Sequence, residues 1–221
     1  MRQYTPVQSS LTCRFAYRNV LPGLPVPGTP AFSQLCKELK KFGFSGEKYI
    51  LETPSGKLSE ARINIPLLQD SLSLRLHYEW FEVVIPVLIE GAEKSAIDIA
   101  NTALAALALL DDDARNGDLV VHSLAHLKLA SEDPDSYLSE HLIGGSEFCQ
   151  PDAFALTLNI GGDKAHRKGR VVIARSLGFA GALFVDYEGE YPGAEFRPAL
   201  VEEVRSEYKW RLQDLGLEAA S

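Results

Sequence analysis

The chain has 221 residues and a mass of 24.3 kDa, with a net charge of −8 and a pI near 5.2. Apolar residues make up 46% and charged residues 24%, a globular composition that excludes a disordered, collagenous or disulfide-scaffold protein. No apolar run reaches the roughly 18–20 residues that a bilayer span needs, so we expect no membrane association.

The first predicted elements are a strand and a helix separated by an irregular segment. Apolar and polar residues alternate over 11–18, which is typical of a half-buried strand. Four prolines and two glycines between 19 and 30 predict an extended loop. Thr29 followed by Pro30 predicts a helix start, because Thr caps the free N–H groups and Pro suits the first turn. We expect Gly43 to end this helix.

A meander and a long helix follow. Alternating apolar residues predict three strands and a fourth β-rich segment, over 47–53, 58–65, 71–78 and 80–88. The helix predicted over 92–110 is apolar on nearly all sides, so we expect burial on more than one side. Three aspartates follow at 111–113, and they predict either a solvated loop or a cation site.

The second half shows a similar order. Strands are predicted over 117–129, 153–160, 170–175 and 181–187, a short helix begins at Asp133-Pro134, and an amphipathic helix covers 198–215. We therefore predict one α+β domain over 1–221, with a mainly antiparallel sheet built from two β-α-β-β-β-α halves, about 11–113 and 117–216. The two long helices are expected on one face of this sheet, with a ligand cleft beneath them.

The cysteines and the charge indicate the compartment. Cys13, Cys36 and Cys149 are odd in number and widely spaced, which is typical of reduced thiols in the cytoplasm. The first residues lead into no apolar stretch, so we expect no secretory signal. A net acidic chain disfavours nucleic acid as a partner.

The strongest acidic group lies near the end of the last predicted strand. Asp186, Glu188 and Glu190 share one strand face, with Glu195 further along the chain. They predict a cation or acid–base site, a solvated edge, or a protein-binding patch in which Tyr187 and Tyr191 are the anchors. Trp80, an aromatic residue among charges, is a further candidate for partner binding.

Basic residues and histidines form two weaker candidates. Lys164, His166, Arg167, Lys168 and Arg170 form a basic run in a predicted hairpin loop, which is either a soluble tip or a minor nucleic-acid or phosphate contact. His122 and His126 suggest metal ligation together with His141 and Cys149. On a strand, however, four residues span about 13 Å, so the first two histidines cannot share one ion. We therefore expect no metal site and no cofactor.

These observations favour a non-enzymatic cytosolic binding protein of bacterial style with a protein partner. An acidic protein that neutralises a basic partner, as immunity proteins and antitoxins do, is one form of this hypothesis. The alternatives are a metal-assisted hydrolase that uses the Asp186 cluster with His77 or His166, and a small-molecule carrier. The oligomeric state stays open, and a homodimer could form through a free strand edge at 11–18 or 181–187.

Overall fold

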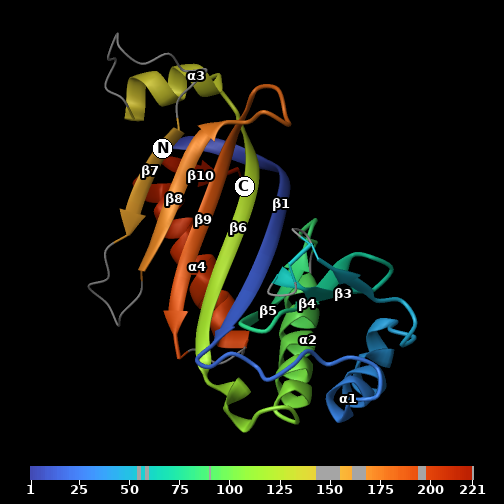
Figure 1. Ribbon diagram of the computed structural model, residues 1–221. Coiled ribbons are helices and arrows are strands. Elements are labelled where there is room, and N and C mark those ends of the chain that lie inside the picture. The colour runs from blue at the N-terminus through green and yellow to red at the C-terminus, as the bar shows by residue number, and fades with distance from the viewer. Residues whose placement is uncertain are drawn as a thin grey trace. The chain divides into compact units, whose positions relative to one another are not determined.

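The computed structural model describes residues 1–53, 56–57, 60–89, 91–142, 155–160, 168–193 and 198–220. The strands are β1 (Arg2–Tyr17), β2 (Ile50–Glu52), β3 (Arg62–Leu67), β4 (Leu72–Leu76), β5 (Trp80–Ile85), β6 (Gly117–Leu129), β7 (Ala155–Ile160), β8 (Lys168–Arg175), β9 (Ala182–Pro192) and β10 (Leu217–Ala219). The α-helices are α1 (Pro30–Leu39), α2 (Ala92–Leu107), α3 (Pro134–Tyr137) and α4 (Pro198–Asp214). The fold is mixed α+β, with a large antiparallel sheet (Figure 1).

The chain divides into two compact units that are discontinuous in sequence. Unit 1 comprises Met1–Ser10, Val121–Glu190 and Glu202–Ser221, and unit 2 comprises Leu11–Val120 and Tyr191–Val201. The long strands β1 and β6 therefore contribute residues to both units. We describe each unit by itself.

Unit 2 is a meander backed by two helices. Hydrogen bonds join its strands in the order β2-β3-β4-β5-β1, and the register places Phe15 opposite Phe81. The inward residues of β3, β4 and β5 are buried, and α2 packs against β5 and β4 while α1 packs against α2 (Figure 1). The Phe15 and Phe81 rings stack with centroids 5.5 Å apart, which fixes β1 on this core.

The start of α1 follows from local sequence, as predicted. Thr29 accepts a hydrogen bond from the backbone N–H of Phe32 (3.2 Å), with Pro30 in the first turn of α1. A short 3-10 helix extends α1 to Phe42, and Gly43, at φ 84°, ends it in the left-handed conformation that glycine favours. A second 3-10 helix, Asp112–Arg115, follows α2, and Asp111 caps it by accepting from the N–H of Asp113 (2.9 Å). Of the aspartates at 111–113, Asp111 has this capping role, and Asp113 accepts a hydrogen bond from the side-chain amide of Asn116 (3.3 Å).

In unit 1, the first part of β1 continues the sheet in the order β1-β6-β9-β8-β7, and β10 pairs with β1 in parallel. Asp133 caps α3, and the π-helix Leu138–Leu142 follows it. Along β9 the residues alternate between buried and half-exposed, and Tyr187 on its inward face contacts Tyr208 of α4 edge-on at 5.8 Å. Helix α4 runs along one face of these strands (Figure 1).

Three expectations need correction. The pseudo-duplication is not supported: four described strands lie between α1 and α2 but three between α3 and α4, and the compact units do not follow halves at 11–113 and 117–216. The long helices over one shared face are not supported either, because α2 belongs to unit 2 and most of α4 to unit 1. The ligand cleft was predicted beneath these two helices, so its prediction is no longer supported. The single domain over 1–221 stays a prediction.

The strand boundaries differ most at the two ends of the chain. Strand β1 begins at Arg2 rather than near Leu11, and β10 was not expected. Both follow from pairing, since Arg2 lies opposite Leu217 and Tyr4 opposite Ala219. The residues of 2–10 are mostly polar, and most of them are exposed, so they carry no clear alternation that would predict a strand.

Candidate functional site

A row of polar side chains crosses the outward face of the sheet in unit 2. The register places Arg14 of β1 opposite Glu82 of β5, Glu82 opposite Arg75 of β4, Arg75 opposite Asn64 of β3, and Asn64 opposite Ile50 of β2. Because side chains of directly opposed residues lie on the same face, all five point away from the helices. We call the four polar members of this set, Arg14, Glu82, Arg75 and Asn64, the polar row.

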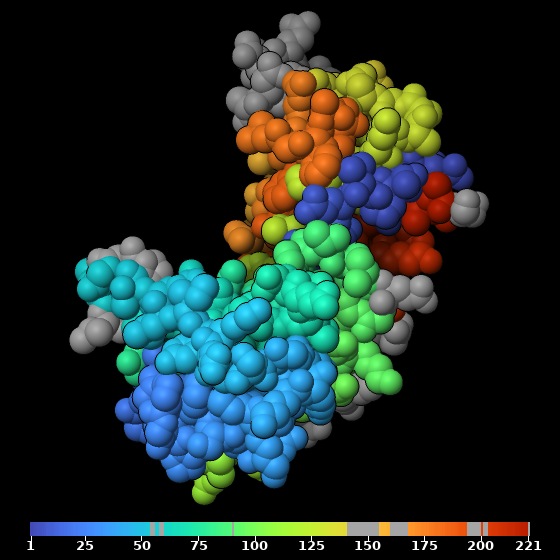
Figure 2. Space-filling model, turned by 90° about the vertical axis from the view of Figure 1, so that its right-hand side faces the viewer, coloured from blue at the N-terminus to red at the C-terminus, as the bar shows by residue number. Residues whose placement is uncertain are grey.

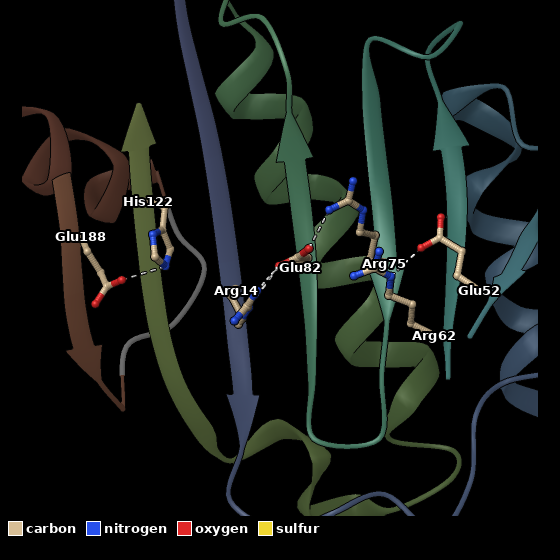
Figure 3. A network of polar contacts seen from close by, with 7 residues as sticks. All are labelled: Arg14, Glu52, Arg62, Arg75, Glu82, His122 and Glu188. Atoms are coloured by element: carbon tan, nitrogen blue, oxygen red, sulfur yellow. Dashed lines mark hydrogen bonds and ion pairs between the residues drawn. The ribbon is translucent and has the colours of Figure 1, made fainter. Parts of the chain in front are cut away.

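Glu82 is the centre of the polar row, and two arginines hold it (Figure 3). Arg14 donates from Nε (3.0 Å) and Nη2 (2.9 Å) to one carboxylate oxygen, and Arg75 donates from Nη1 (3.0 Å) to the other. The Glu82 side chain is only 4% exposed, whereas those of Arg14 and Arg75 are 41% and 32% exposed. A buried carboxylate needs such partners, because leaving it unpaired would cost several kcal/mol, on the order of 3–5.

Trp80 lies beside the polar row, at the start of β5, and is half-exposed. The Arg14 guanidinium carbon lies 4.6 Å from the centroid of a Trp80 ring, which is a cation–π contact. The His77 ring stacks on Trp80 with centroids 4.9 Å apart and planes at 16°. His77 Nδ1 in turn accepts from the backbone N–H of Glu79 (3.2 Å), so the stacked ring is held in place.

The outer end of this face carries a second charged group (Figure 3). Arg62 donates from Nε to Glu52, and Asn64 donates from its amide nitrogen to the same carboxylate (3.3 Å). The hydrogen bond from Arg62 is the main reason why the pKa of Glu52 lies below its ordinary value. On opposed residues of the polar row, Arg75 Nε and Asn64 Oδ1 are each buried without a hydrogen-bond partner among the described residues.

Strand β2 forms the end of the sheet in unit 2. Ile50 and Leu51 are 56% and 58% exposed, and the residues near position 50, drawn in cyan, lie at the surface in Figure 2. The strand has only three residues and ends in a glutamate, features that limit unwanted pairing at a sheet edge.

In unit 1, the predicted acidic group and part of the predicted basic run form one cross-strand set. Lys168 of β8 lies opposite Glu190 of β9, and Arg170 lies opposite Glu188. An Arg170 guanidinium nitrogen is 3.4 Å from a Glu188 carboxylate oxygen and 4.0 Å from one of Asp186. Lys168 therefore belongs to a strand rather than to the predicted loop, and Arg170 lies in the same strand, which was predicted to begin there. Both residues offset part of the acidic charge.

The two histidines of β6 both lie on its half-exposed side, and each contacts a different partner. His122 Nε2 lies 3.2 Å from a Glu188 carboxylate oxygen. His126 Nδ1 is hydrogen-bonded to the hydroxyl of Ser176 (2.8 Å), and its ring contacts Phe179 at 4.6 Å. Within the described ranges, no group of three or more His, Cys, Asp or Glu residues is arranged to hold a metal ion.

The remaining predicted residues have mixed outcomes. Asp186, Glu188 and Glu190 do share one half-exposed face of β9. Tyr187 and Tyr191, the predicted anchors in one of the three alternatives for this group, are 2% and 3% exposed and face inward, so they present little surface to a partner. Lys164, His166, Arg167, Cys149 and Glu195, and the side chain of His141, lie outside what the structure describes.

The thiols in unit 2 are poor nucleophiles. Burial, with a smaller contribution from the charge of Glu93, raises the pKa of Cys13 to about 12. Burial also raises the pKa of Cys36. Because the thiolate is the reactive form, Cys13 is almost entirely unreactive at neutral pH.

Sequence reasoning identified Trp80 but missed the set around Glu82. The alternation pattern did place Arg14 and Arg75 on outward strand faces. The missing information was the register, because a period of two tells which face a residue occupies but not which residue lies across from it.

The comparisons with known proteins return no relative. No family model matches the chain, and neither a curated protein nor a solved structure gives a significant match. No helix in the described part of the chain is long and apolar enough to cross a membrane. The functional argument therefore depends on the residues themselves.

Proposed function

We propose that this protein is a non-enzymatic binding protein that holds a protein partner on the outward sheet face of unit 2. The observation that supports this most is the half-exposed Trp80, stacked on His77 and covered by Arg14, beside the Arg14–Glu82–Arg75 set. Tryptophan and arginine are the residues most enriched among those that dominate protein–protein affinity.

Preorganisation is the second support. Arg14, Trp80 and Arg75 are on paired strands rather than loops, and each has its orientation set by a neighbour. A partner that binds such a surface loses less conformational entropy on the protein side, so more of the contact energy appears as affinity.

The other forms of the binding hypothesis have less support. Neutralisation of a basic partner by the Asp186 cluster is weakened because Arg170 and His122 already lie against those carboxylates. A metal-assisted hydrolase would need a group of ligands, and none is found in the described ranges. We propose a cytoplasmic location from the unpaired cysteines, and a net charge of −8 disfavours a nucleic-acid partner.

Site-specific photo-crosslinking in the cells that make the protein tests this proposal. A photoreactive amino acid replaces Ser73, which is half-exposed and opposite Val84 on the outward face. We expect one discrete cross-linked protein, which then binds the purified chain, and loss of both signals in Trp80→Ala.

The matched control has the same photoreactive group at Lys37, an exposed position on α1 in the same unit. The proposal is contradicted if Ser73 and Lys37 give the same adducts. It is also contradicted if the purified adduct protein binds Trp80→Ala as tightly as the unaltered chain, provided that circular dichroism shows the variant folded.

A further inference from the structure

Building on the proposed function, we infer that the partner segment bound by the outward face of unit 2 is acidic, and that Arg14 and Arg75 bind its carboxylates. This inference concerns only the chemical class of the partner. It depends on the donors that remain on the two arginines, on the charge of the face and on the position of Trp80.

The first argument concerns unused hydrogen-bond donors. A guanidinium has five N–H bonds in a fixed plane, a geometry that matches a carboxylate. Arg14 commits Nε and Nη2 to Glu82, and Arg75 commits Nη1 to the same side chain. Within the described part of the chain, Arg14 Nη1 and Arg75 Nη2 have no acceptor, and these side chains are 41% and 32% exposed.

The second argument concerns charge. The charged residues on the outward face of β2, β3, β4, β5 and β1 are the arginines at 14, 62 and 75 and the glutamates at 52 and 82. Over these five strands, three positive and two negative charges leave one net positive charge on a protein whose total is −8. Asp118, in the part of β6 that belongs to unit 2, is outside this count, and its carboxylate accepts a hydrogen bond from the backbone N–H of Gly193 (3.1 Å). This face is therefore complementary to an acidic segment, while the molecule as a whole repels acidic chains.

The third argument comes from Glu82 itself. Its carboxylate already receives three hydrogen bonds from Arg14 and Arg75. The same two arginines therefore bind a glutamate carboxylate within the chain in the way that we infer for a glutamate of the partner. A partner glutamate would place its methylene groups near the half-exposed Trp80 ring while its carboxylate meets the free donors. Aromatic and charged contacts would then act together, as at the centre of many protein interfaces.

The test uses Trp80 as an internal reporter. The sequence has two tryptophans, so Trp210→Phe leaves Trp80 as the only one. We titrate this variant with a capped hexaglutamate peptide at low ionic strength and record tryptophan fluorescence. We expect a saturable change with Kd in the millimolar range or tighter, and about tenfold weaker binding in Arg14→Gln and in Arg75→Gln.

The chain offers two matched controls. Arg115→Gln removes an exposed arginine from the same unit but outside this face, and it should leave the titration unchanged. Trp80→Phe leaves Trp210, whose ring lies 4.1 Å from the Arg211 guanidinium carbon in unit 1, and this tryptophan should not respond. If Arg75→Gln fails to fold, Arg75→Lys keeps the charge but loses the planar fork and should also weaken binding.

Several results would overturn the inference: no saturable change with hexaglutamate, equal binding of hexalysine, tighter binding of a single-stranded oligonucleotide, or an equal loss in Arg115→Gln. If any of these results occurs while the Ser73 adduct persists, the inference that the partner segment is acidic is wrong, but the proposed partner site is still supported. If the photoreactive group at Ser73 also gives no adduct that the group at Lys37 lacks, the proposed function fails as well.

Discussion

Arg14 donates two hydrogen bonds to the same carboxylate oxygen of Glu82, although the two residues are 68 positions apart in sequence. Their positions opposite each other on β1 and β5 make this contact possible, and Arg75 completes it from the other side. The pair is partly buried, so its effect on stability should be measurable, unlike that of most exposed ion pairs.

The first prediction concerns Glu82. Glu82→Ala should lower the free energy of unfolding by about 1–3 kcal/mol, because the side chain is nearly buried and its removal leaves two arginines without their partner. The loss stays moderate because both arginines are partly exposed and can be hydrated. Urea denaturation followed by circular dichroism measures it.

Glu79→Ala is the control for that measurement, since Glu79 is exposed in the turn before β5. Its effect should stay within about 0.5 kcal/mol. Equal losses in the two variants would mean that the contacts of Glu82 contribute nothing of their own.

The second prediction compares two tyrosine hydroxyl groups of unit 1. The Tyr137 hydroxyl donates to the carbonyl of Leu215 (2.7 Å), whereas the Tyr208 hydroxyl is buried without a partner in the part of the chain that is described. Tyr137→Phe should therefore cost about 1–1.5 kcal/mol, and Tyr208→Phe should be neutral or slightly stabilising. The urea midpoints of the two variants decide the matter, and a larger loss in Tyr208→Phe would contradict the assigned hydrogen bonding.

The third prediction concerns Gly117, at the start of β6. A Cβ atom here would lie 2.1 Å from the Ala16 carbonyl oxygen and 2.7 Å from the Phe15 ring, so the strands could not keep their spacing. Gly117→Ala should destabilise the protein by about 1–3 kcal/mol or more. Gly178→Ala, where a Cβ meets nothing within 4 Å, should cost less than about 1 kcal/mol in the same thermal or urea assay.

The fourth prediction is a pH dependence. Burial raises the pKa of Cys13 from 9.0 to about 12 in the folded protein, so between these values the unfolded chain loses its thiol proton first. The contribution of the Cys13 thiol to the free energy of unfolding is fully present below pH 9. It falls as the pH rises toward 12, by up to about 1.4 kcal/mol per pH unit. Urea midpoints measured between pH 8 and 10.5 should fall less steeply in Cys13→Ala, and parallel slopes would refute the assignment.

Local features of the fold could be predicted because they depend on residues close together in sequence. Leu119, Val121, Leu127 and Leu129 alternate with polar residues, and β6 buries all four, as its period of two requires. Thr29-Pro30 and Asp133-Pro134 begin helices because the capping oxygen and the N–H group that it satisfies lie within three residues. The outward position of Asp186, Glu188 and Glu190 follows from the same period.

Register, by contrast, was decided only by the tertiary structure. Nothing local in Arg170 indicates that Glu188 lies across from it, so an acidic cluster and a basic run appeared as two separate sites when they are one set of cross-strand pairs. The same holds for Arg14 and Glu82. Alternation selects the face of a strand, but the choice of the opposing residue depends on how distant segments bury their apolar sides together, which no local pattern contains.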